Sequence, residues 1–199
     1  KIYSINEDFQ YTTIINYSAN DNISSNIESQ KIEKVTELTK ADGIGIIGVG
    51  NFAKLKVLPN IIKYSGKKNI KALVTKNGFS ALSTINNFNL DCYSDSDYRV
   101  VCKDLNIGTI FILTRHNTHF EIIKEGLKRG KNIFVEKPTV LLASELEQLR
   151  EIIKENSLNR NLIHTGYNRR FSPHIKFAKS KLNNCSSPIM VNIRVNAGK

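Results

Sequence analysis

Apolar residues recur along most of the chain in two alternating rhythms. Short, mostly apolar runs, typical of strands buried on both faces, fall at residues 44–47, 70–75, 109–113, 132–135 and 162–165, and another short strand is expected at 91–94. Between them, apolar positions repeat about every three to four residues, as on one face of a helix, at 52–64, 78–88, 96–103, 116–130 and 141–156. Pro59 is expected to kink or split the first of these helices. The alternation predicts an α/β fold, a doubly wound parallel sheet.

The two ends of the chain differ from this repeating middle. Residues 1–41 are rich in Asn, Ser and Thr, include one strand-like piece at 11–17, and are interpreted as an N-terminal segment and linker. Residues 166–199 combine an aromatic and basic loop, a helical pattern at 174–182 and a strand-like alternation at 189–196. We therefore expect one domain at 42–165 and the start of a truncated second α/β domain at 166–199. Both ends of the chain are expected to be cuts in a longer polypeptide.

Composition narrows the range of partners. The formal charge of +11 is spread along the chain without a basic block, which favours a generally basic surface over a nucleic-acid interface. No apolar run is long enough to cross a membrane and none reads as a signal peptide, so we expect a soluble, cytoplasmic protein. Cys92, Cys102 and Cys185 lack the spacing of zinc ligands, so no metal site is expected.

A glycine-rich turn follows the first apolar run. Gly48, Gly50 and Ala53 have the G-x-G-x-x-A spacing of a dinucleotide-binding turn. The first glycine permits a tight turn, the second lets the backbone approach a pyrophosphate, and the alanine lets the next helix pack closely on the strand. Asn51 and Phe52 lie in the same turn, at the expected helix N-terminus, where free N–H groups favour phosphate.

Four motifs together resemble those of the Gfo/Idh/MocA oxidoreductases. They read GIGIIGVGNFAKLKVLP, TRHNTHF, GKNIFVEKP and GYNRRFSP, in the order and spacing of that family. The resemblance implies that residues 42–165 form an NAD(P)-binding Rossmann domain and that a C-terminal α/β domain with an open sheet follows. The wording GNFAKLKVLP, TRHNTHF and VNAG is most similar to bi-domain oxidoreductases of bacterial surface-polysaccharide loci, in which this module is fused behind a zinc-type alcohol dehydrogenase module.

The EKP motif carries the catalytic assignment that the resemblance implies. Lys137 would reach the nicotinamide and the substrate hydroxyl, Glu136 would help hold the cofactor, and Pro138 would shape the turn. Removing a hydride from a carbinol carbon requires loss of the hydroxyl proton, so a cation beside that oxygen stabilises the alkoxide, and burial can lower the pKa of such a lysine. Without the motif around it, a Glu-Lys pair at a strand end is more often a solvated pair.

Two further clusters are placed at strand ends. Thr114, Arg115 and His116 follow the fourth strand and are expected to bind the cofactor, with His119 as cofactor-lining support and Asn117 or Thr118 as a helix cap. The resemblance places Asn168 and Arg169 at the substrate cleft. Arg169 and Arg170 could clamp a carboxylate or phosphate, and a surface or interdomain salt bridge is about equally compatible with either arginine.

The identity of the cofactor depends on the end of the second strand. An NAD site favours an acidic residue there, whereas this chain has Thr75, Lys76 and Asn77. A lysine with two neutral polar groups suits a 2′-phosphate, so NADP is modestly preferred over NAD. Alternatively, Lys76 points to solvent and neither cofactor is favoured.

The sequence leads to one principal hypothesis and one alternative. The first is an NAD(P)-dependent oxidoreductase that transfers a hydride to or from a hydroxyl carbon of a sugar or sugar derivative, and the resemblance implies a possible homo-oligomer in the full-length protein. The family's second catalytic residue, a histidine in a G-G-x-x-x-D-x-x-x-H type motif, would lie beyond residue 199. The alternative is therefore a non-catalytic dinucleotide-binding module, a sensor or a structural part of a larger fusion.

Overall fold

The protein is built on a parallel six-stranded sheet. The computed structural model describes residues 41–155, 163–183, 185, 187–192 and 194. The strand order is β3-β2-β1-β4-β5-β6, and every neighbouring pair is parallel. The strands are β1 (Gly43–Ile47), β2 (Ile70–Val74), β3 (Tyr93–Asp95), β4 (Ile107–Ile112), β5 (Asn132–Val135) and β6 (Ile163–Thr165). This is the doubly wound order of a Rossmann fold, so the predicted fold class is confirmed, and the order reverses between β1 and β4.

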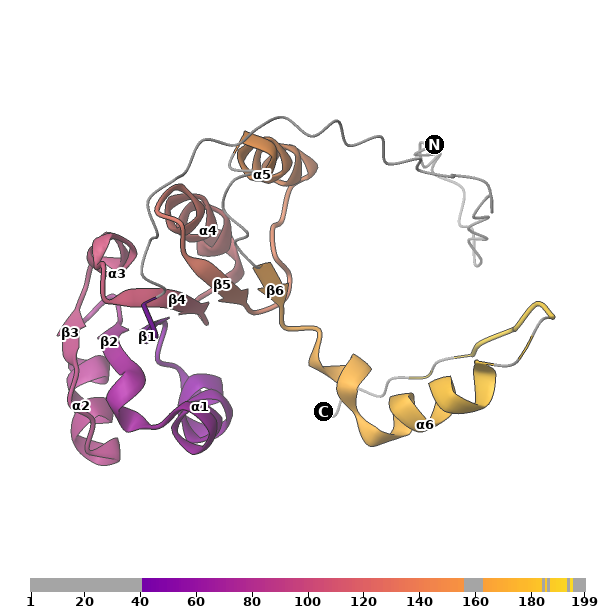
Figure 1. The fold of residues 1–199 in the computed structure, drawn as a ribbon, viewed down its shortest axis with the longest axis horizontal. Coiled ribbons are helices and arrows are strands. Elements are labelled where there is room, and N and C mark those ends of the chain that lie inside the picture. Colours follow the sequence, from indigo (N-terminus) through magenta and orange to yellow (C-terminus); the bar gives the residue numbers. More distant parts are fainter. Residues whose placement is uncertain (1–40, 156–162, 184, 186, 193, 195–199) are drawn as a thin grey trace. The chain divides into compact units, whose positions relative to one another are not determined.

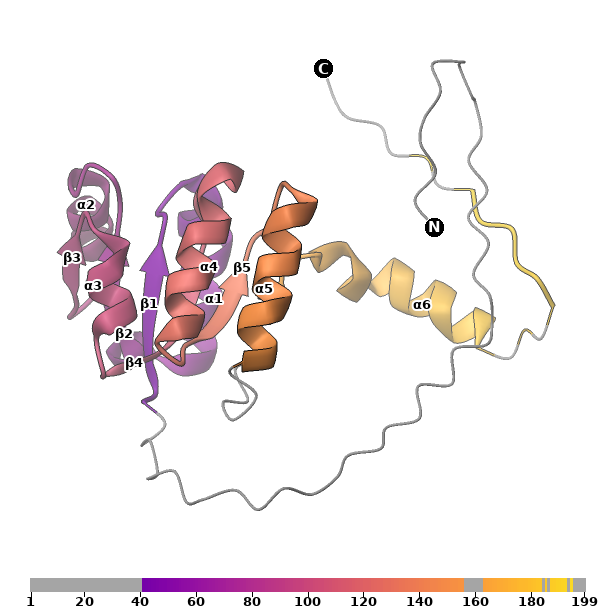
Figure 2. The same cartoon turned by 90° about the horizontal axis from the view of Figure 1, so that it is seen from above.

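Helices cover the sheet in two layers. The helices α1 (Leu58–Ser65) and α2 (Phe79–Phe88) lie on one face, and α3 (Tyr98–Lys103), α4 (His119–Lys128) and α5 (Ala143–Glu155) lie on the other (Figure 1). The last three helices stand side by side over the strands (Figure 2). Each layer has its own apolar core, with Leu58 and Leu73 in the first and Ile110 and Ile123 in the second. Burying these side chains on both faces is the main source of stability.

Pro59 divides the first helical segment, as predicted. A π-helical turn, η1 (Ala53–Val57), precedes α1, and Pro59 lies in the first turn of α1. Helical backbone runs without a break from residue 51 through η1 into α1, so the wider π turn lies where the proline interrupts the regular i to i−4 hydrogen bonds. Short 3-10 turns occupy η2 (Lys67–Asn69), η3 (His116–Thr118) and η4 (Asn168–Phe171).

The last described part of the chain contains one helix. Helix α6 (Pro173–Leu182) begins at Ser172, whose hydroxyl accepts a hydrogen bond from the N–H of Ile175 at 3.3 Å. The strand expected at 189–196 was wrong for 189–192 and 194, which form no strand, and the rest of it lies outside the described residues, as does the piece at 11–17. Alternation alone does not make a strand, because a strand also needs a neighbour to receive its hydrogen bonds.

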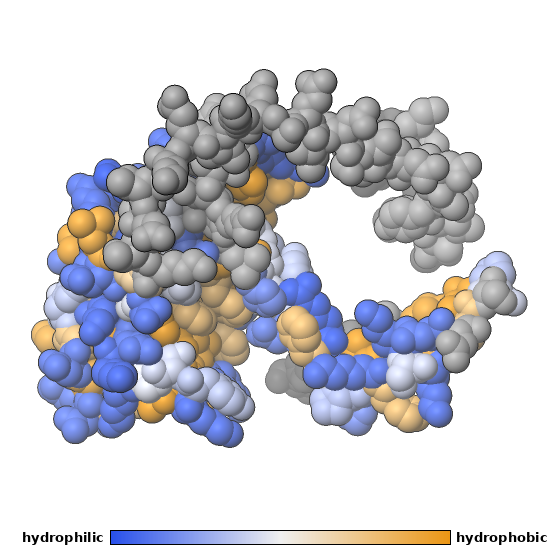
Figure 3. Space-filling view, viewed as in Figure 1, coloured by the Kyte–Doolittle hydropathy of each residue, from blue (hydrophilic) through white to orange (hydrophobic). Residues whose placement is uncertain are grey.

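The surface of the described residues is mainly hydrophilic around the helices. Hydrophilic residues cover most of the visible surface of α1, α2 and α3, with single apolar residues among them (Figure 3). Within the described ranges, no helix combines the length and the apolar character that crossing a membrane would require.

Candidate active site

The loops that carry the predicted site residues meet at the carboxyl edge of the sheet. Backbone hydrogen bonds continue past the strand ends, from Gly48 N to the Val74 carbonyl (2.8 Å), from Leu113 N to the Ile47 carbonyl (2.8 Å) and from Glu136 N to the Ile112 carbonyl (3.0 Å). The loops after β1, β4 and β5 are therefore held in line with their strands. In open α/β sheets, ligands bind at this edge, where the strand order reverses.

Gly48 and Gly50 have different environments. Gly48 has a φ of +94°, and a Cβ atom there would lie 2.7 Å from the Leu113 carbonyl and 2.8 Å from Thr114 N. The turn after β1 thus fits against the loop after β4 only with glycine at residue 48. Gly50 is exposed, and a Cβ atom there would meet nothing within 4 Å, so its backbone faces open space.

The helix that follows this turn is suited to an anion. Helical backbone begins at Asn51, and Asn51 and Phe52 are both exposed, whereas Ala53 is only 1% exposed and packs inward. No acidic residue occupies the first turn, so the N–H groups and the positive end of the helix dipole are not neutralised locally. The turn therefore fits a pyrophosphate.

The loop after β2 contains a polar atom without a partner. Thr75 donates its N–H to the Asp95 carbonyl at 3.2 Å, but its hydroxyl oxygen is buried and forms no hydrogen bond with the described residues. Lys76 and Asn77 are exposed beside it. A buried hydroxyl without a partner is costly, and a ribose hydroxyl or phosphate oxygen would supply one. With the open space at Gly50, this supports the fit of a dinucleotide.

The EKP loop follows β5 and contacts the residues that follow β6. The Asn168 side-chain amide donates to Glu136 Oε1 at 3.4 Å, and a Cβ atom at Gly166 would lie 2.6 Å from the same oxygen. The structure thus brings together Glu136, predicted to bind the cofactor, and Asn168, predicted to bind the substrate. Thr139 and Thr165 add a second link, with their hydroxyl oxygens 2.7 Å apart. This pair was not predicted, because no pattern in the sequence marks it.

Lys137 lies at the tip of this loop. Its side chain is exposed, and it is joined to Pro138 by a cis peptide bond. The structure therefore does not give this lysine the buried environment that the sequence analysis considered. Its ammonium group is accessible to a ligand at the carboxyl edge.

His119, expected as cofactor-lining support, is buried behind the loops of the site. Its side chain is 0% exposed, and its role toward the cofactor stays a prediction. The ring lies between two loops, with Nδ1 2.7 Å from the Pro138 carbonyl oxygen and Nε2 3.2 Å from the Thr114 carbonyl oxygen. The apolar pattern of the helix that His119 begins explains the burial, because His119 and Phe120 both face the core.

The loop after β4 departs from the predicted capping. Thr118 precedes α4, but its hydroxyl does not cap the helix and instead donates to the Arg115 carbonyl at 2.8 Å. The same oxygen lies 2.7 Å from the hydroxyl of half-buried Thr114. The Arg115, His116 and Asn117 side chains are exposed. This loop thus places two hydrogen-bonded threonines and the exposed side chains of Arg115 and His116 at the carboxyl ends of the strands.

The two arginines after β6 have separate environments. Arg169 is exposed, whereas Arg170 donates to the Thr165 carbonyl at 3.4 Å and lies over the Phe171 ring at 4.8 Å. No ion pair forms for either guanidinium group with the residues described. Arg169 therefore remains the candidate substrate contact, and Arg170 orders the turn that carries it.

An aromatic stack also orders this turn. Ring centroids lie 5.1 Å apart between Phe111 and Phe134, 5.6 Å between Phe134 and His164, and 6.1 Å between His164 and Phe171. These rings run across β4, β5 and β6 to η4. Such contacts add to area burial and fix the GYNRRF turn beside the last strand.

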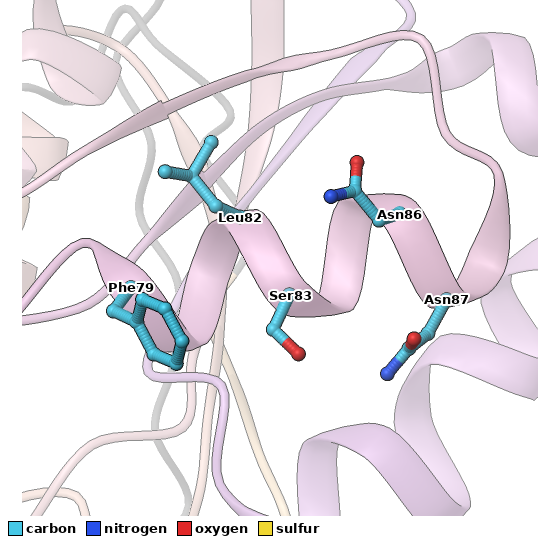
Figure 4. Close-up of a pocket in the computed structure, with 5 residues that line it drawn as sticks. All are labelled: Phe79, Leu82, Ser83, Asn86 and Asn87. Atoms are coloured by element: carbon cyan, nitrogen blue, oxygen red, sulfur yellow. The ribbon is translucent and has the colours of Figure 1, made fainter.

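A groove of about 420 Å³ lies elsewhere, along helix α2 (Figure 4). It is lined by Phe79, Leu82, Ser83, Asn86 and Asn87. All five side chains come from one helix, and none belongs to the loops of the carboxyl edge. The groove is therefore separate from the candidate site.

Comparisons with known proteins agree with this geometry. The family model GFO_IDH_MocA, described as an oxidoreductase family with an NAD-binding Rossmann fold, matches residues 43–164. The uncharacterized oxidoreductase YrbE of Bacillus subtilis (strain 168) is 33% identical over 147 residues, which cover 74% of this chain and 41% of YrbE. An inositol 2-dehydrogenase/D-chiro-inositol 3-dehydrogenase of Lactiplantibacillus plantarum is 26% identical over 154 residues, covering 76% of this chain and 43% of the relative.

A solved structure is similar in fold. The scyllo-inositol dehydrogenase of Lactobacillus casei, crystallised with NAD(H) and scyllo-inositol, matches with a TM-score of 0.63 and 21% identity, over 71% of this chain and 40% of that one. The chain thus spans about two fifths of the length of the relatives that it matches.

Proposed function

Because the chain belongs to the Gfo/Idh/MocA family of oxidoreductases, we propose that it carries the cofactor half of an enzyme that transfers a hydride to or from a hydroxyl carbon of a sugar or polyol. The observation that carries the proposal is the position of the glycine turn, with Gly50 open to a ligand where the strand order reverses. The inositol dehydrogenase relative supports a polyhydroxylated ring as the substrate class. The motif wording supports a place in surface-polysaccharide synthesis.

The residues at the carboxyl ends of the strands would have separate roles. The N–H groups at Gly50, Asn51 and Phe52 would hold the pyrophosphate, and the loops after β2 and β4 would hold the rest of the dinucleotide. A bound nicotinamide would supply or accept the hydride. The exposed Lys137 ammonium would lie beside the substrate hydroxyl and stabilise negative charge on its oxygen as the proton leaves. Asn168 and Arg169 would orient the substrate from the β6 side.

The role of Lys137 is tested in the full-length polypeptide that contains this chain. We expect Lys137→Met to lower kcat for NAD(P)-dependent oxidation of inositols and sugars by about 100-fold or more, because one stabilising group is lost at the reacting oxygen. The Kd for ADP-ribose, which lacks the nicotinamide ring that Lys137 would contact, should change by less than about threefold. Lys154→Met, at an exposed position of α5, is the matched control and should leave both quantities unchanged. Retained turnover in Lys137→Met would sink the catalytic assignment of this lysine, whereas no turnover by the wild type would favour a non-catalytic dinucleotide-binding module.

We further propose that the loop after β2 prefers NADP over NAD. Lys76 is exposed beside the unpartnered Thr75 hydroxyl, at the strand end that usually contacts the adenosine ribose. A lysine there can pair with a 2′-phosphate, and none of residues 75–77 is an acid that would favour the 2′-hydroxyl.

The preference is tested by measuring Kd for NADPH and NADH. Lys76→Glu should weaken NADPH binding by about tenfold or more, since it replaces an attraction with a repulsion, while NADH binding should change little. Lys68→Glu makes the same charge change at an exposed position of η2 and should alter neither constant. Tighter binding of NADH than NADPH to the wild type would refute the preference.

A further inference from the structure

His119 occupies an unusual position between the two loops that flank the expected nicotinamide site. It begins α4, its ring is 0% exposed, and both ring nitrogens lie within hydrogen-bond distance of backbone carbonyls. One carbonyl belongs to Pro138 of the EKP loop and the other to Thr114 of the loop after β4. A buried side chain thus connects two loops that are separate in sequence.

The two contacts are not equivalent. Carbonyl oxygens only accept, so the ring must donate, and a neutral imidazole carries one N–H. The contact from Nδ1 to the Pro138 oxygen, at 2.7 Å, is shorter than the contact from Nε2 to the Thr114 oxygen, at 3.2 Å. Nδ1 is therefore the donor in the neutral ring, and the link to the EKP loop is the stronger one.

Lys137 depends on its backbone for placement. Its ammonium group forms no hydrogen bond or ion pair with the residues that the structure describes. The backbone is fixed on both sides, by the bond from Glu136 N to the Ile112 carbonyl at 3.0 Å and by the bond from His119 to the Pro138 carbonyl at 2.7 Å. Removing the second bond would free the turn that carries the lysine.

We propose that His119 is a positioning residue that holds Lys137 against the nicotinamide end of the bound cofactor, through the hydrogen bond from Nδ1 to the Pro138 carbonyl. The inference rests on the proposed function, which places Lys137 at that end. It predicts that loss of the Nδ1 donor weakens contacts with the nicotinamide and spares contacts with the adenosine and pyrophosphate, which lie at the loops after β1 and β2.

Two ligands distinguish contacts with the nicotinamide from contacts with the adenosine and pyrophosphate. One is whichever of NADH and NADPH binds the wild type more tightly. The other is the same molecule without the nicotinamide ring, ADP-ribose or 2′-phospho-ADP-ribose. A merely structural role for His119 would change the Kd of both ligands in parallel, whereas a positioning role changes the ratio of the two constants.

Three substitutions of His119 distinguish the role of Nδ1 from the role of Nε2. The side-chain amide of His119→Asn reaches about as far as Nδ1 and can still donate to Pro138, whereas that of His119→Gln reaches about as far as Nε2. His119→Leu removes both donors. Thr84→Val is the matched control, because Thr84 is also buried but donates within α2 to the Ser80 carbonyl at 2.7 Å, away from both loops.

We expect His119→Gln and His119→Leu to lose about tenfold in affinity for the dinucleotide relative to its nicotinamide-free form, and His119→Asn to restore the wild-type ratio. Thr84→Val should lower the melting temperature without changing the ratio. Parallel loss of both ligands, or a ratio restored by Gln and not by Asn, would overturn the inference while leaving the proposed function in place. If His119→Leu does not fold, the ratio of the two Kd values in His119→Asn and His119→Gln still tests the inference. A folded wild type with no affinity for either ligand would overturn the proposed function, and the inference with it.

Discussion

At the scale of single residues, the two glycines of the β1 turn serve different purposes. Gly48 is required by the fold, because its φ of +94° and its contact with the β4 loop exclude a side chain. Gly50 has neither constraint, since its φ is not in the left-handed range and a Cβ atom there would meet nothing within 4 Å. Nothing among the described residues calls for glycine there, and the reason that we propose for it is the approach of a ligand to the backbone.

Buried thiols predict how stability depends on pH. Burial, with the nearby charge of Glu125, raises the pKa of Cys102 from 9.0 to about 11, and burial with Asp91 does the same for Cys92. Between pH 9 and 11 the unfolded chain loses these protons while the folded chain keeps them. The stability that the two protonated thiols contribute is therefore fully present below pH 9 and is lost as the pH rises through this window.

The contribution of Cys102 is measurable because its side chain is 0% exposed. Between pH 8 and 11, Cys102→Ala should lose about 2 kcal/mol less of its free energy of unfolding than the wild type does. Denaturant unfolding at each pH gives this difference. Cys185→Ala, at an exposed position, is the control. Equal losses for Cys102→Ala and the wild type would contradict the prediction.

At the scale of elements, a buried lysine connects β4 and β5 at the amino ends of the strands, opposite the site. Lys131 is 5% exposed, and its ammonium group donates to the Asp104 carbonyl at 2.7 Å and the Ile107 carbonyl at 2.6 Å. It thereby joins the start of β5 to the turn before β4. Burial lowers the pKa of this lysine, because charge is costly in the protein interior.

Lys131→Met should lower the free energy of unfolding by about 1 to 2 kcal/mol. Two charge-assisted hydrogen bonds are lost, and the relief of burying a cation offsets part of that loss. Chemical denaturation measures the change, with Lys128→Met at the exposed end of α4 as the control. Stability equal to or above that of the wild type would mean that the cost of burying the charge outweighs its hydrogen bonds.

The elements of the sheet were predictable because their signals are local. Apolar runs marked the five strands other than β3, and Pro59 marked the division of the first helix. β3 was expected at 91–94 and lies at Tyr93–Asp95, because a short edge strand has little apolar pattern to mark its ends. The His119 bridge and the ring stack from Phe111 to Phe171 depend on which loops meet in space, and no local pattern records that.

At the scale of the whole molecule, the parallel topology assembles the site. The loops that contain Gly48, Thr75, Thr114 and Glu136 are far apart in the chain, yet all follow the carboxyl ends of strands in one sheet. The positions of the candidate residues could therefore be predicted once the fold class was known. Which of them are buried could not be predicted, and the full burial of His119 is the clearest example.

The most direct test of the account is calorimetric titration of NADPH and NADH into the wild type and Gly50→Asp. The aspartate is compatible with an exposed helix N-terminus, so the variant should fold, but its carboxylate would occupy the space of the pyrophosphate. Asn87→Asp, which adds the same charge on the exposed surface of α2, is the control. We predict saturable binding by the wild type and the control, and affinity about 100-fold lower in folded Gly50→Asp. Equal affinity in Gly50→Asp, or no binding by the wild type, would contradict the placement of a dinucleotide at this turn.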